Sequence, residues 1–216
     1  GLVTGGALGK IPDAAMEIIN LAEKNVMALT KLVNDILDFE RADSGQLTLN
    51  FQRFNLITFL QDNLRSHQGL ADKYGVHFEL SQNDPYIEVE ADTHRIAQVI
   101  ANLLSNAAKY SPKGAAVHID VQAGETDVEI FVSDKGPGIP KEFEGKVFER
   151  FTQADATDDR NFGGTGLGLS ISKLIMHHHR GEIDFQSSPD EGTTFRIQFP
   201  RRLTLSRSAA ETGRNL

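Results

Sequence analysis

The stretch NFGGTGLGLSISK, residues 161–173, places four glycines within six positions and then continues with apolar residues at helical spacing. The four are Gly163, Gly164, Gly166 and Gly168. Because one glycine costs a helix about 1 kcal/mol, four of them indicate a loop whose backbone approaches another group closely. A loop of free N–H groups that leads into a helix N-terminus is suited to bind anions, above all phosphate. A flexible hinge before a helix is the alternative that this stretch alone leaves open.

Composition limits the class of protein. The chain has 216 residues, 39% of them hydrophobic and 24% charged, which is enough for one core and an appendage. No apolar run reaches the roughly 20 residues of a membrane span, and no signal peptide opens the sequence. The absence of cysteine excludes disulfides and thiolate chemistry. A net charge of −8 argues against broad nucleic-acid binding.

The segment from Pro12 to about Ser44 has the pattern of one long helix. Its apolar residues recur at alternating spacings of three and four, which is the seam of a coiled coil. The seam consists of Ala15, Ile19, Ala22, Val26, Leu29, Val33 and Ile36. A helix of this length, roughly 45–50 Å, is expected to pack its seam against another helix, although packing on its own core is the alternative.

In the rest of the chain, segments with the apolar spacing of helices alternate with segments that have the spacing of strands. Helices are expected over residues 56–73, 93–110, with Asp92 as N-cap, and 167–179. Strands are expected over residues 47–51, 76–80, 86–90, 117–122, 128–133, 182–186 and 194–199. Adjacent strand pairs with few strand–helix–strand repeats favour an α+β sandwich over a doubly wound parallel sheet. Residues 201–216 have no sustained pattern and are expected to form a mobile tail.

Two common phosphate-binding motifs do not fit the glycine-rich stretch. A dinucleotide fingerprint needs glycines at relative positions 1, 3 and 6, and Leu169 or Ile171 stands at the sixth position when the count starts at Gly164 or Gly166. A Walker loop needs Lys and then Ser or Thr after its last glycine, but Leu169 follows Gly168. The phosphate site is therefore of another kind.

Four separate stretches occur in a fixed order along the chain. They are NLLSNAAKYSP (102–112), SDKGPGIP (133–140), VFERFTQAD (147–155) and GGTGLGLS (163–170). Together they resemble the N, G1, F and G2 boxes of the ATP-binding domain of sensor histidine kinases, within the GHKL ATPase superfamily. The resemblance implies a two-layer α/β sandwich over residues 46–200. Residues 1–45 likewise resemble the second helix of the dimerisation and phosphotransfer domain.

The resemblance assigns roles at the N box. Asn102 and Asn106 lie one helical turn apart and share a helix face. It makes Asn106 the Mg²⁺ ligand and Asn102 its polar neighbour near the phosphates of ATP. Lys109 then offers a point charge to phosphate, and Tyr110 covers the adenine. Solvent exposure is the alternative for each side chain taken alone.

The G1 box supplies the adenine contact. Asp134 ends an apolar strand and begins the turn of Gly136, Pro137 and Gly138, with Ile139 beside it. By resemblance the carboxylate accepts a hydrogen bond from the adenine amino group. A carboxylate that only caps the turn is the alternative.

The remaining two boxes enclose the nucleotide lid, residues 152–163. Phe148 and Phe151 are expected to anchor its start, although core packing explains them as well. Within the lid, Arg160 is the cation placed to reach the terminal phosphate, among Asp155, Asp158 and Asp159. The resemblance implies that Gly164, Thr165, Gly166, Leu167 and Gly168 fold the lid over the phosphates and start the next helix.

The chain contains seven histidines, and none of them lies in the His-Glu-x-x-x-Pro box that carries the phosphoacceptor in this family. The run His177, His178 and His179 is interpreted as a helix end and not as a metal site, because adjacent helical residues point about 100° apart. We therefore expect no catalytic residue of the phosphoacceptor kind here, and no autophosphorylation by this chain alone.

The resemblance implies a protein-histidine kinase that uses ATP and Mg²⁺. It implies a homodimer formed through the long helix, a response-regulator receiver domain as partner, and no nucleic acid. It also implies a cytoplasmic location, with membrane or sensor domains only upstream. Two rivals remain: a GHKL ATPase that drives conformational change, and a nucleotide-binding scaffold without catalysis.

Overall fold

The computed structural model describes residues 12–44, 47–82, 84–152, 165–189 and 191–202. The chain divides into two compact units between Leu47 and Thr48. In the first unit one helix, α1 (Asp13–Asp43), accounts for the regular structure of the described residues. The predicted long helix is confirmed, and its limits agree with the sequence pattern to within one residue at each end.

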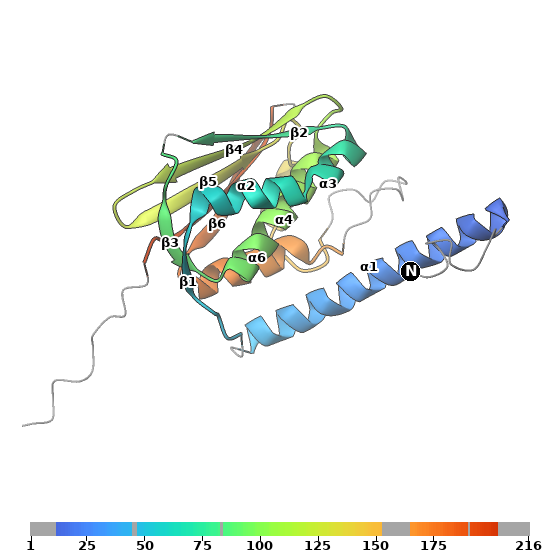
Figure 1. Ribbon diagram of the computed structural model, residues 1–216, viewed down its shortest axis with the longest axis horizontal. Helices are drawn as coiled ribbons and strands as arrows, with labels where there is room; N and C mark the ends of the chain where they lie inside the picture. The colour runs from blue at the N-terminus through green and yellow to red at the C-terminus, as the bar shows by residue number, and fades with distance from the viewer. Residues whose placement is uncertain (1–11, 45–46, 83, 153–164, 190, 203–216) are drawn as a thin grey trace, which may run out of the picture. The chain divides into compact units, whose positions relative to one another are not determined.

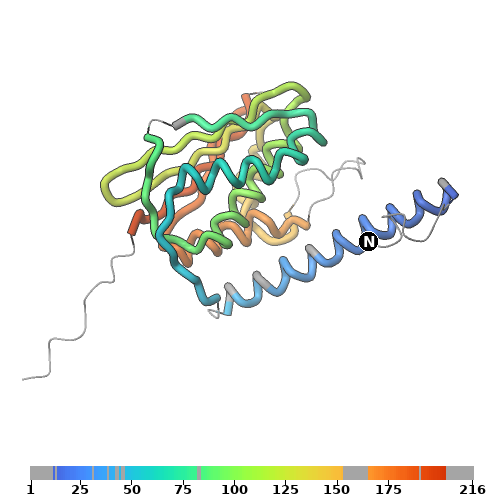
Figure 2. The backbone as a smooth tube through the Cα atoms, viewed as in Figure 1, coloured from blue at the N-terminus to red at the C-terminus, as the bar shows by residue number. Residues whose placement is uncertain are grey.

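The second unit is built on a five-stranded mixed sheet with the strand order β2-β4-β5-β7-β6. Its strands are β2 (His77–Gln82), β4 (Ala116–Ala123), β5 (Asp127–Ser133), β6 (Glu182–Ser188) and β7 (Gly192–Pro200). Strands β2 and β4 are parallel, and the other neighbours are antiparallel. A separate antiparallel pair joins β1 (Gln52–Asn55) to β3 (Glu88–Ala91), and the two segments lie side by side in Figure 2.

Helices cover one face of the five-stranded sheet (Figure 1). They are α2 (Leu56–Ser66), α3 (Gln68–Tyr74), α4 (Thr93–Tyr110) and α6 (Gly168–His178), and the short α5 (Lys141–Glu144) lies between β5 and α6 in sequence. Every second residue of β5 is buried beneath this layer, as alternation in a half-covered strand predicts. Helix α4 supplies much of the core, with Ile96, Leu103 and Leu104 fully buried. The α+β sandwich is therefore confirmed.

The start of α4 follows from one side chain. The Asp92 Oδ1 atom accepts a hydrogen bond from the Arg95 backbone N–H at 3.0 Å, which satisfies one of the free donors of the first turn. The second oxygen of the same carboxylate, Oδ2, accepts from the Asn50 N–H at 2.8 Å. The predicted N-cap is confirmed, and it also fastens the segment that precedes β1.

Two of the predicted elements are wrong in detail. Residues 47–51 do not form a strand, because the Asn50 N–H bonds to Asp92 and the pairing with β3 begins only at Gln52. The helix expected over residues 56–73 is broken at His67 into α2 and α3. The His67 Nδ1 atom lies 2.8 Å from the Asn63 carbonyl oxygen at this break.

Candidate nucleotide-binding site

Asp134 directly follows β5 and is 92% buried, with 8% of its surface exposed. Its Oδ1 atom accepts hydrogen bonds from the Gly136 N–H at 2.8 Å and the Thr193 N–H at 3.2 Å. The Asp134 N–H in turn donates to the Thr193 carbonyl oxygen at 2.8 Å. The carboxylate is thus fixed through one oxygen, and no hydrogen bond to its Oδ2 atom occurs within the described part of the chain.

Burial raises the pKa of the Asp134 carboxyl, because a charged group loses hydration inside the protein. The two hydrogen bonds from the Gly136 and Thr193 N–H groups act in the opposite direction and lower it. No cation of the described residues pairs with this carboxylate, so keeping it charged in a buried position costs folding stability. A position of this kind is typical of a functional group.

The loop after Asp134 lies against two other segments. A Cβ atom at Gly136 would come 3.0 Å from the carbonyl oxygen of Tyr110, at the end of α4. The Ile139 N–H donates to the Ser187 Oγ atom at 2.8 Å, and Gly138 lies directly against the Ser188 backbone. The G1 box is therefore held between the N box and the turn that joins β6 to β7.

Sequence reasoning missed Ser187 and Thr193. Thr193 holds Asp134 through its backbone, and its Oγ1 atom lies 3.0 Å from the Ser187 Oγ atom. A backbone N–H has no residue signature, so the contact to Thr193 was not visible in the sequence. The Gly192-Thr193-Thr194 run at the start of β7 was the available signal.

The N box lies on α4, as predicted. Asn102 donates from Nδ2 to the Ser172 Oγ atom on α6 at 3.1 Å. The Asn106 amide makes no hydrogen bond to another described residue. Lys109 donates from Nζ to the Tyr110 hydroxyl at 2.9 Å and also lies over that ring, 4.5 Å from its centre. Of the two amides predicted near phosphate, Asn102 is thus bonded to the protein, and Asn106 has no hydrogen-bond partner within the described ranges.

The two ends of the predicted lid meet at its base. The Phe151 N–H donates to the Gly166 carbonyl oxygen at 2.9 Å. Gly166 has φ +69°, and a Cβ atom there would lie 2.7 Å from the Phe151 Cα atom, so only glycine fits without strain. Thr165 accepts through Oγ1 from the Leu167 N–H at 3.3 Å, and Leu167 is buried. Residues 153–164 lie outside the described residues; they comprise all of the predicted lid (152–163) except Thr152, with Asp155, Asp158, Asp159, Arg160 and Gly163, and also Gly164 of the G2 box.

The two phenylalanines of the F box differ. The Phe148 ring lies 6.0 Å from that of Phe185 on β6, and the Lys173 Nζ atom of α6 lies 5.3 Å from the Phe148 ring centre. Phe148 thus joins the start of the lid to the sheet and to α6. Phe151 is 65% exposed and has φ 59°. Core packing as an explanation is therefore wrong for Phe151.

The histidine run ends α6 and does not gather around one point. His177 is exposed, whereas His179 is buried and lies edge-on to the Phe51 ring at 5.3 Å. The His179 Nδ1 atom lies 2.8 Å from the Ile175 carbonyl oxygen, and its Nε2 atom accepts from the Asp92 N–H at 3.1 Å. Across the described ranges, no group of three or more His, Cys, Asp or Glu side chains is arranged to hold a metal ion.

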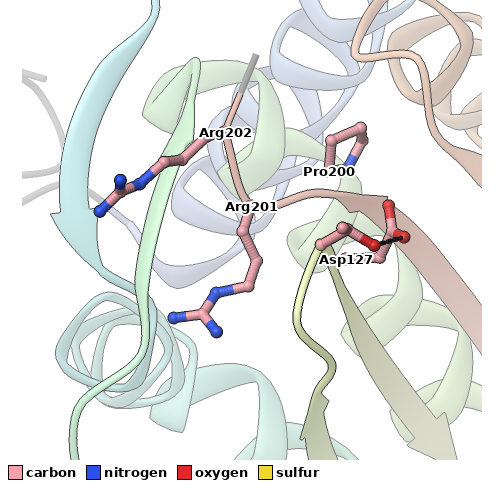
Figure 3. Close-up of a pocket in the computed structure, with 5 residues that line it drawn as sticks. Asp127, Pro200, Arg201 and Arg202 are labelled. Carbon is pink, nitrogen blue, oxygen red and sulfur yellow. Dashed lines mark hydrogen bonds between the residues drawn. The ribbon is translucent and has the colours of Figure 1, made fainter. Parts of the chain in front are cut away.

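A separate hollow of about 390 Å³ is lined by Thr126, Asp127, Pro200, Arg201 and Arg202. Figure 3 shows the side chains of Arg201 and Arg202 directed away from Asp127. The hollow lies at the first residue of β5, whereas Asp134 follows the last, a separation of about 20 Å along the strand. The Arg201 guanidinium donates to the carbonyl oxygens of Glu88 and Gly124, so it serves to join β3 to the β4–β5 turn.

Comparison with known proteins gives the family. Residues 91–203, more than half of the chain, match the family described as histidine kinase-, DNA gyrase B-, and HSP90-like ATPase. The chain belongs to this family. The sensor histidine kinase WalK of Bacillus subtilis is 35% identical over 192 residues, which are 87% of this chain and 31% of WalK. The chain spans only part of such relatives: it covers 12% of the hybrid signal transduction histidine kinase D of Dictyostelium discoideum and 32% of the sensor protein SrrB of Staphylococcus aureus.

Solved structures agree with this assignment. Full-length ShkA in complex with AMPPNP has a TM-score of 0.77 at 24% identity, covering 88% of this chain and 40% of ShkA, and it supports the fold. The histidine kinase ThkA in complex with the response regulator TrrA has a TM-score of 0.69 at 25% identity, covering 93% of this chain and 57% of that one.

Among the helices of the described residues, none combines the length and the apolar character needed to cross a membrane.

Proposed function

We propose that the second unit binds Mg²⁺-ATP, with the adenine at Asp134 and the phosphates between α4 and α6. The observation that carries the proposal is the Oδ2 atom of Asp134, which no described residue of the chain hydrogen-bonds. Its partner oxygen Oδ1 is held by two N–H groups, so the carboxylate has a fixed orientation before any ligand arrives. A fixed, desolvated acceptor suits the exocyclic amino group of adenine and discriminates against the 6-oxo group of guanine.

The phosphate end is assigned to Asn106, Lys109 and the first turn of α6. Mg²⁺ binds oxygen ligands, keeps several waters and takes most of its remaining contacts from substrate phosphates. A single amide oxygen without a partner among the described residues fits this demand, and Asn106 has it. When bound, Mg²⁺ neutralises charge on the phosphates. Lys109 adds a positive charge beside Tyr110, and the N–H groups at the start of α6 face anions favourably.

For the whole protein we propose a sensor histidine kinase. Its relatives support transfer of the γ-phosphoryl group of ATP to a histidine, followed by relay to an aspartate of a response regulator. The AMPPNP complex of ShkA supports nucleotide binding, and the ThkA–TrrA complex supports a receiver domain as partner. We place the domain in the cytoplasm, where ATP is available. Positioning and charge neutralisation supply most of the catalysis in reactions of this class.

We also propose that α1 is the second helix of a dimerisation domain and pairs with a second copy of the protein. Large apolar side chains are exposed along it: Ile18, Leu21, Val26, Met27, Leu29, Val33, Ile36 and Leu37. Four of them, Val26, Leu29, Val33 and Ile36, belong to the predicted coiled-coil seam. An exposed apolar stripe of this length is unusual for a helix without a partner.

Labelling of the full-length protein tests the proposal. With ATP labelled at the γ-phosphate and Mg²⁺ present, an acid-labile, alkali-stable label is expected on histidine. Release of phosphate without labelling would instead identify an ATPase, and nucleotide binding with neither would identify a scaffold.

The metal role of Asn106 has its own test. Asn106→Ala is expected to weaken Mg²⁺-ATP binding by about 10- to 100-fold, as changes around a bound metal typically do. Binding of ATP in excess EDTA should change little, and calorimetry measures both. An equal loss with and without Mg²⁺ would remove Asn106 from the metal site.

A further inference from the structure

The first asparagine of the N box reaches across to α6. Asn102 donates from Nδ2 to the Ser172 Oγ atom at 3.1 Å, and Ser172 donates from the same oxygen to the Gly168 carbonyl oxygen at 2.9 Å. Ser172 is 1% exposed. The hydroxyl hydrogen and one lone pair are thus both used, and the chain of bonds runs from α4 to the first residue of α6.

Packing at Gly168 shows how closely the two helices approach. A Cβ atom added to Gly168 would clash with the Oδ1 atom of Asn102. The amide of Asn102 therefore lies directly against the first turn of α6, with its nitrogen bonded to Ser172. Glycine at position 168 is required by this contact.

The contact between Asn102 and α6 lies next to the groups proposed to bind the phosphates of ATP. Asn106 is one helical turn from Asn102 along α4, so the two amides are on the same face. The first turn of α6 presents the N–H groups that no carbonyl of the helix accepts. A bond between Asn102 and Ser172 therefore fixes the position of Asn106 relative to those N–H groups.

We propose that Asn102 and Ser172 form a cross-helix clasp that positions the start of α6 against α4, and that Ser172 is a positioning residue for the phosphates of ATP. The inference rests on the proposed nucleotide site. It gives Asn102 a role distinct from that of Asn106: Asn102 orders the protein, and Asn106 meets the ligand.

Ser172→Ala tests the clasp without removing the helix. Alanine is the best helix former, and the backbone bonds of α6 do not need the hydroxyl. The variant leaves Asn102 without its acceptor, so Mg²⁺-ATP affinity is expected to fall about three- to tenfold, the range of one net hydrogen bond. Adenosine, which has no phosphates, should bind unchanged in ligand-observed NMR titrations. If Ser172 had only a structural role, the variant would lower the affinities for Mg²⁺-ATP and for adenosine alike.

Ser170→Ala is the matched control. Ser170 is also buried on α6, but its Oγ atom donates only to the Leu167 carbonyl oxygen three residues before it. This variant should bind Mg²⁺-ATP within about twofold of the parent, because the Ser170 hydroxyl bonds to no described residue of α4. In an Asn102→Ala background, Ser172→Ala should have no further effect, as expected for two ends of one bond.

Calorimetry at a temperature where all variants are folded by circular dichroism decides the outcome. The clasp is overturned if Ser172→Ala binds Mg²⁺-ATP like the parent, if it behaves like Ser170→Ala, or if adenosine affinity falls equally. Should Ser172→Ala not fold, Ser172→Cys replaces it under the same criteria, since its thiol accepts only weakly. A parent protein that binds no Mg²⁺-ATP would refute the proposed function, which is a different result.

Discussion

At one end of the proposed nucleotide site, Asp134 is held by N–H groups from two separate segments, whereas at the other end Asn106 bonds to no described residue. The adenine end is closed by contacts between the G1 loop, the end of α4 and the turn before β7. The phosphate end consists of the Asn106 amide, which has no hydrogen-bond partner among the described residues, of Lys109 bonded to Tyr110, and of the start of α6.

The difference indicates which part of the site the protein builds alone. Selection of the base needs a rigid acceptor. A carboxylate that could turn away would avoid repulsion by the 6-oxo group of guanine and would discriminate less between guanine and adenine. Binding of Mg²⁺ needs an oxygen ligand that is not already bonded, and among the described residues the Asn106 amide meets this need. We therefore expect changes at the adenine end to alter specificity, and changes at the phosphate end to alter affinity and metal dependence.

The largest effect is expected from Asp134→Asn. The Gly136 and Thr193 N–H groups keep the amide oxygen at the Oδ1 position, so the NH₂ group takes the place of Oδ2. It then faces the adenine amino group, donor against donor, and ATP affinity should fall by about 1.5–3 kcal/mol, or roughly 10- to 150-fold. ITP carries a 6-oxo group that can accept from this NH₂ group, so Asp134→Asn should bind ITP more tightly than ATP. Calorimetry with both nucleotides measures this.

Stability provides the control for this variant. Burial raises the pKa of Asp134 above its ordinary 3.8, so the stability that this group contributes falls as pH rises from that value through the folded pKa. Asparagine carries no such charge, and the melting temperature of Asp134→Asn at neutral pH should not be lower than that of the parent. Asp127→Asn, at the other end of β5, should leave ATP affinity unchanged. A loss of ATP binding with equal loss of stability would mean that Asp134 is only structural.

A smaller effect is expected at the base of the lid. Gly166→Ala places a Cβ atom 2.7 Å from the Phe151 Cα atom in a backbone with φ +69°. The left-handed conformation alone costs about 1–2 kcal/mol, so Mg²⁺-ATP affinity should fall about tenfold while the core stays folded.

Gly145→Ala is the matched control for the lid. Gly145 has φ −68°, and nothing lies within 4 Å of an added Cβ atom. Its nucleotide affinity should equal that of the parent. If both variants bind alike in fluorescence titrations, the closed base of the lid has no part in binding.

The smallest effect concerns a residue remote from the ligand. Burial lowers the pKa of His179 from its ordinary 6.5; the Ile175 carbonyl and the Asp92 carboxylate oppose this, and His178 adds to it. The neutral imidazole accepts from the Asp92 N–H, which an added proton would repel. The stability from this group is complete above pH 6.5 and declines as pH falls from there toward the folded pKa, by at most about 1.4 kcal/mol per pH unit.

Urea unfolding between pH 7.5 and 5 measures this dependence. His179→Gln should flatten that part of the profile, whereas His177→Gln, on the exposed side of the same helix end, should not. Since His179 joins the start of α4 to the end of α6, adenine specificity should be insensitive to its protonation. An unchanged profile for His179→Gln would contradict the role of this imidazole.

Elements with strong local signals were predictable from the sequence. Helix α4 combines an N-cap at Asp92 with regular apolar spacing, and its predicted limits agree with the structure. The strand expected over 47–51 failed because pairing partners are chosen by distant residues, here Ala91 and Asp92. The break at His67 carries no glycine or proline at that position, although Gly69 follows two residues later, and the apolar periodicity on both sides suggested one helix.

The candidate site was predictable where single residues stand in local patterns, and not where contacts join segments that are distant in the sequence. Asp134, Asn106 and Gly166 stand in recognisable patterns. The clamp by Thr193 uses a backbone N–H, and the bond from Asn102 to Ser172 joins residues 70 positions apart. Such contacts depend on how the sheet and helices pack, which no local pattern of the chain encodes.

Residue-resolved hydrogen exchange by NMR, with and without Mg²⁺-ATP, tests the contrast between the two ends most directly. The Gly136 and Thr193 amides should be protected before nucleotide is added and change little afterwards. The amides at the start of α6, Gly168 and Leu169, should gain protection only with Mg²⁺-ATP. Rapid exchange at Gly136 and Thr193 in the free protein, or no change at Gly168 and Leu169 on binding, would contradict the account.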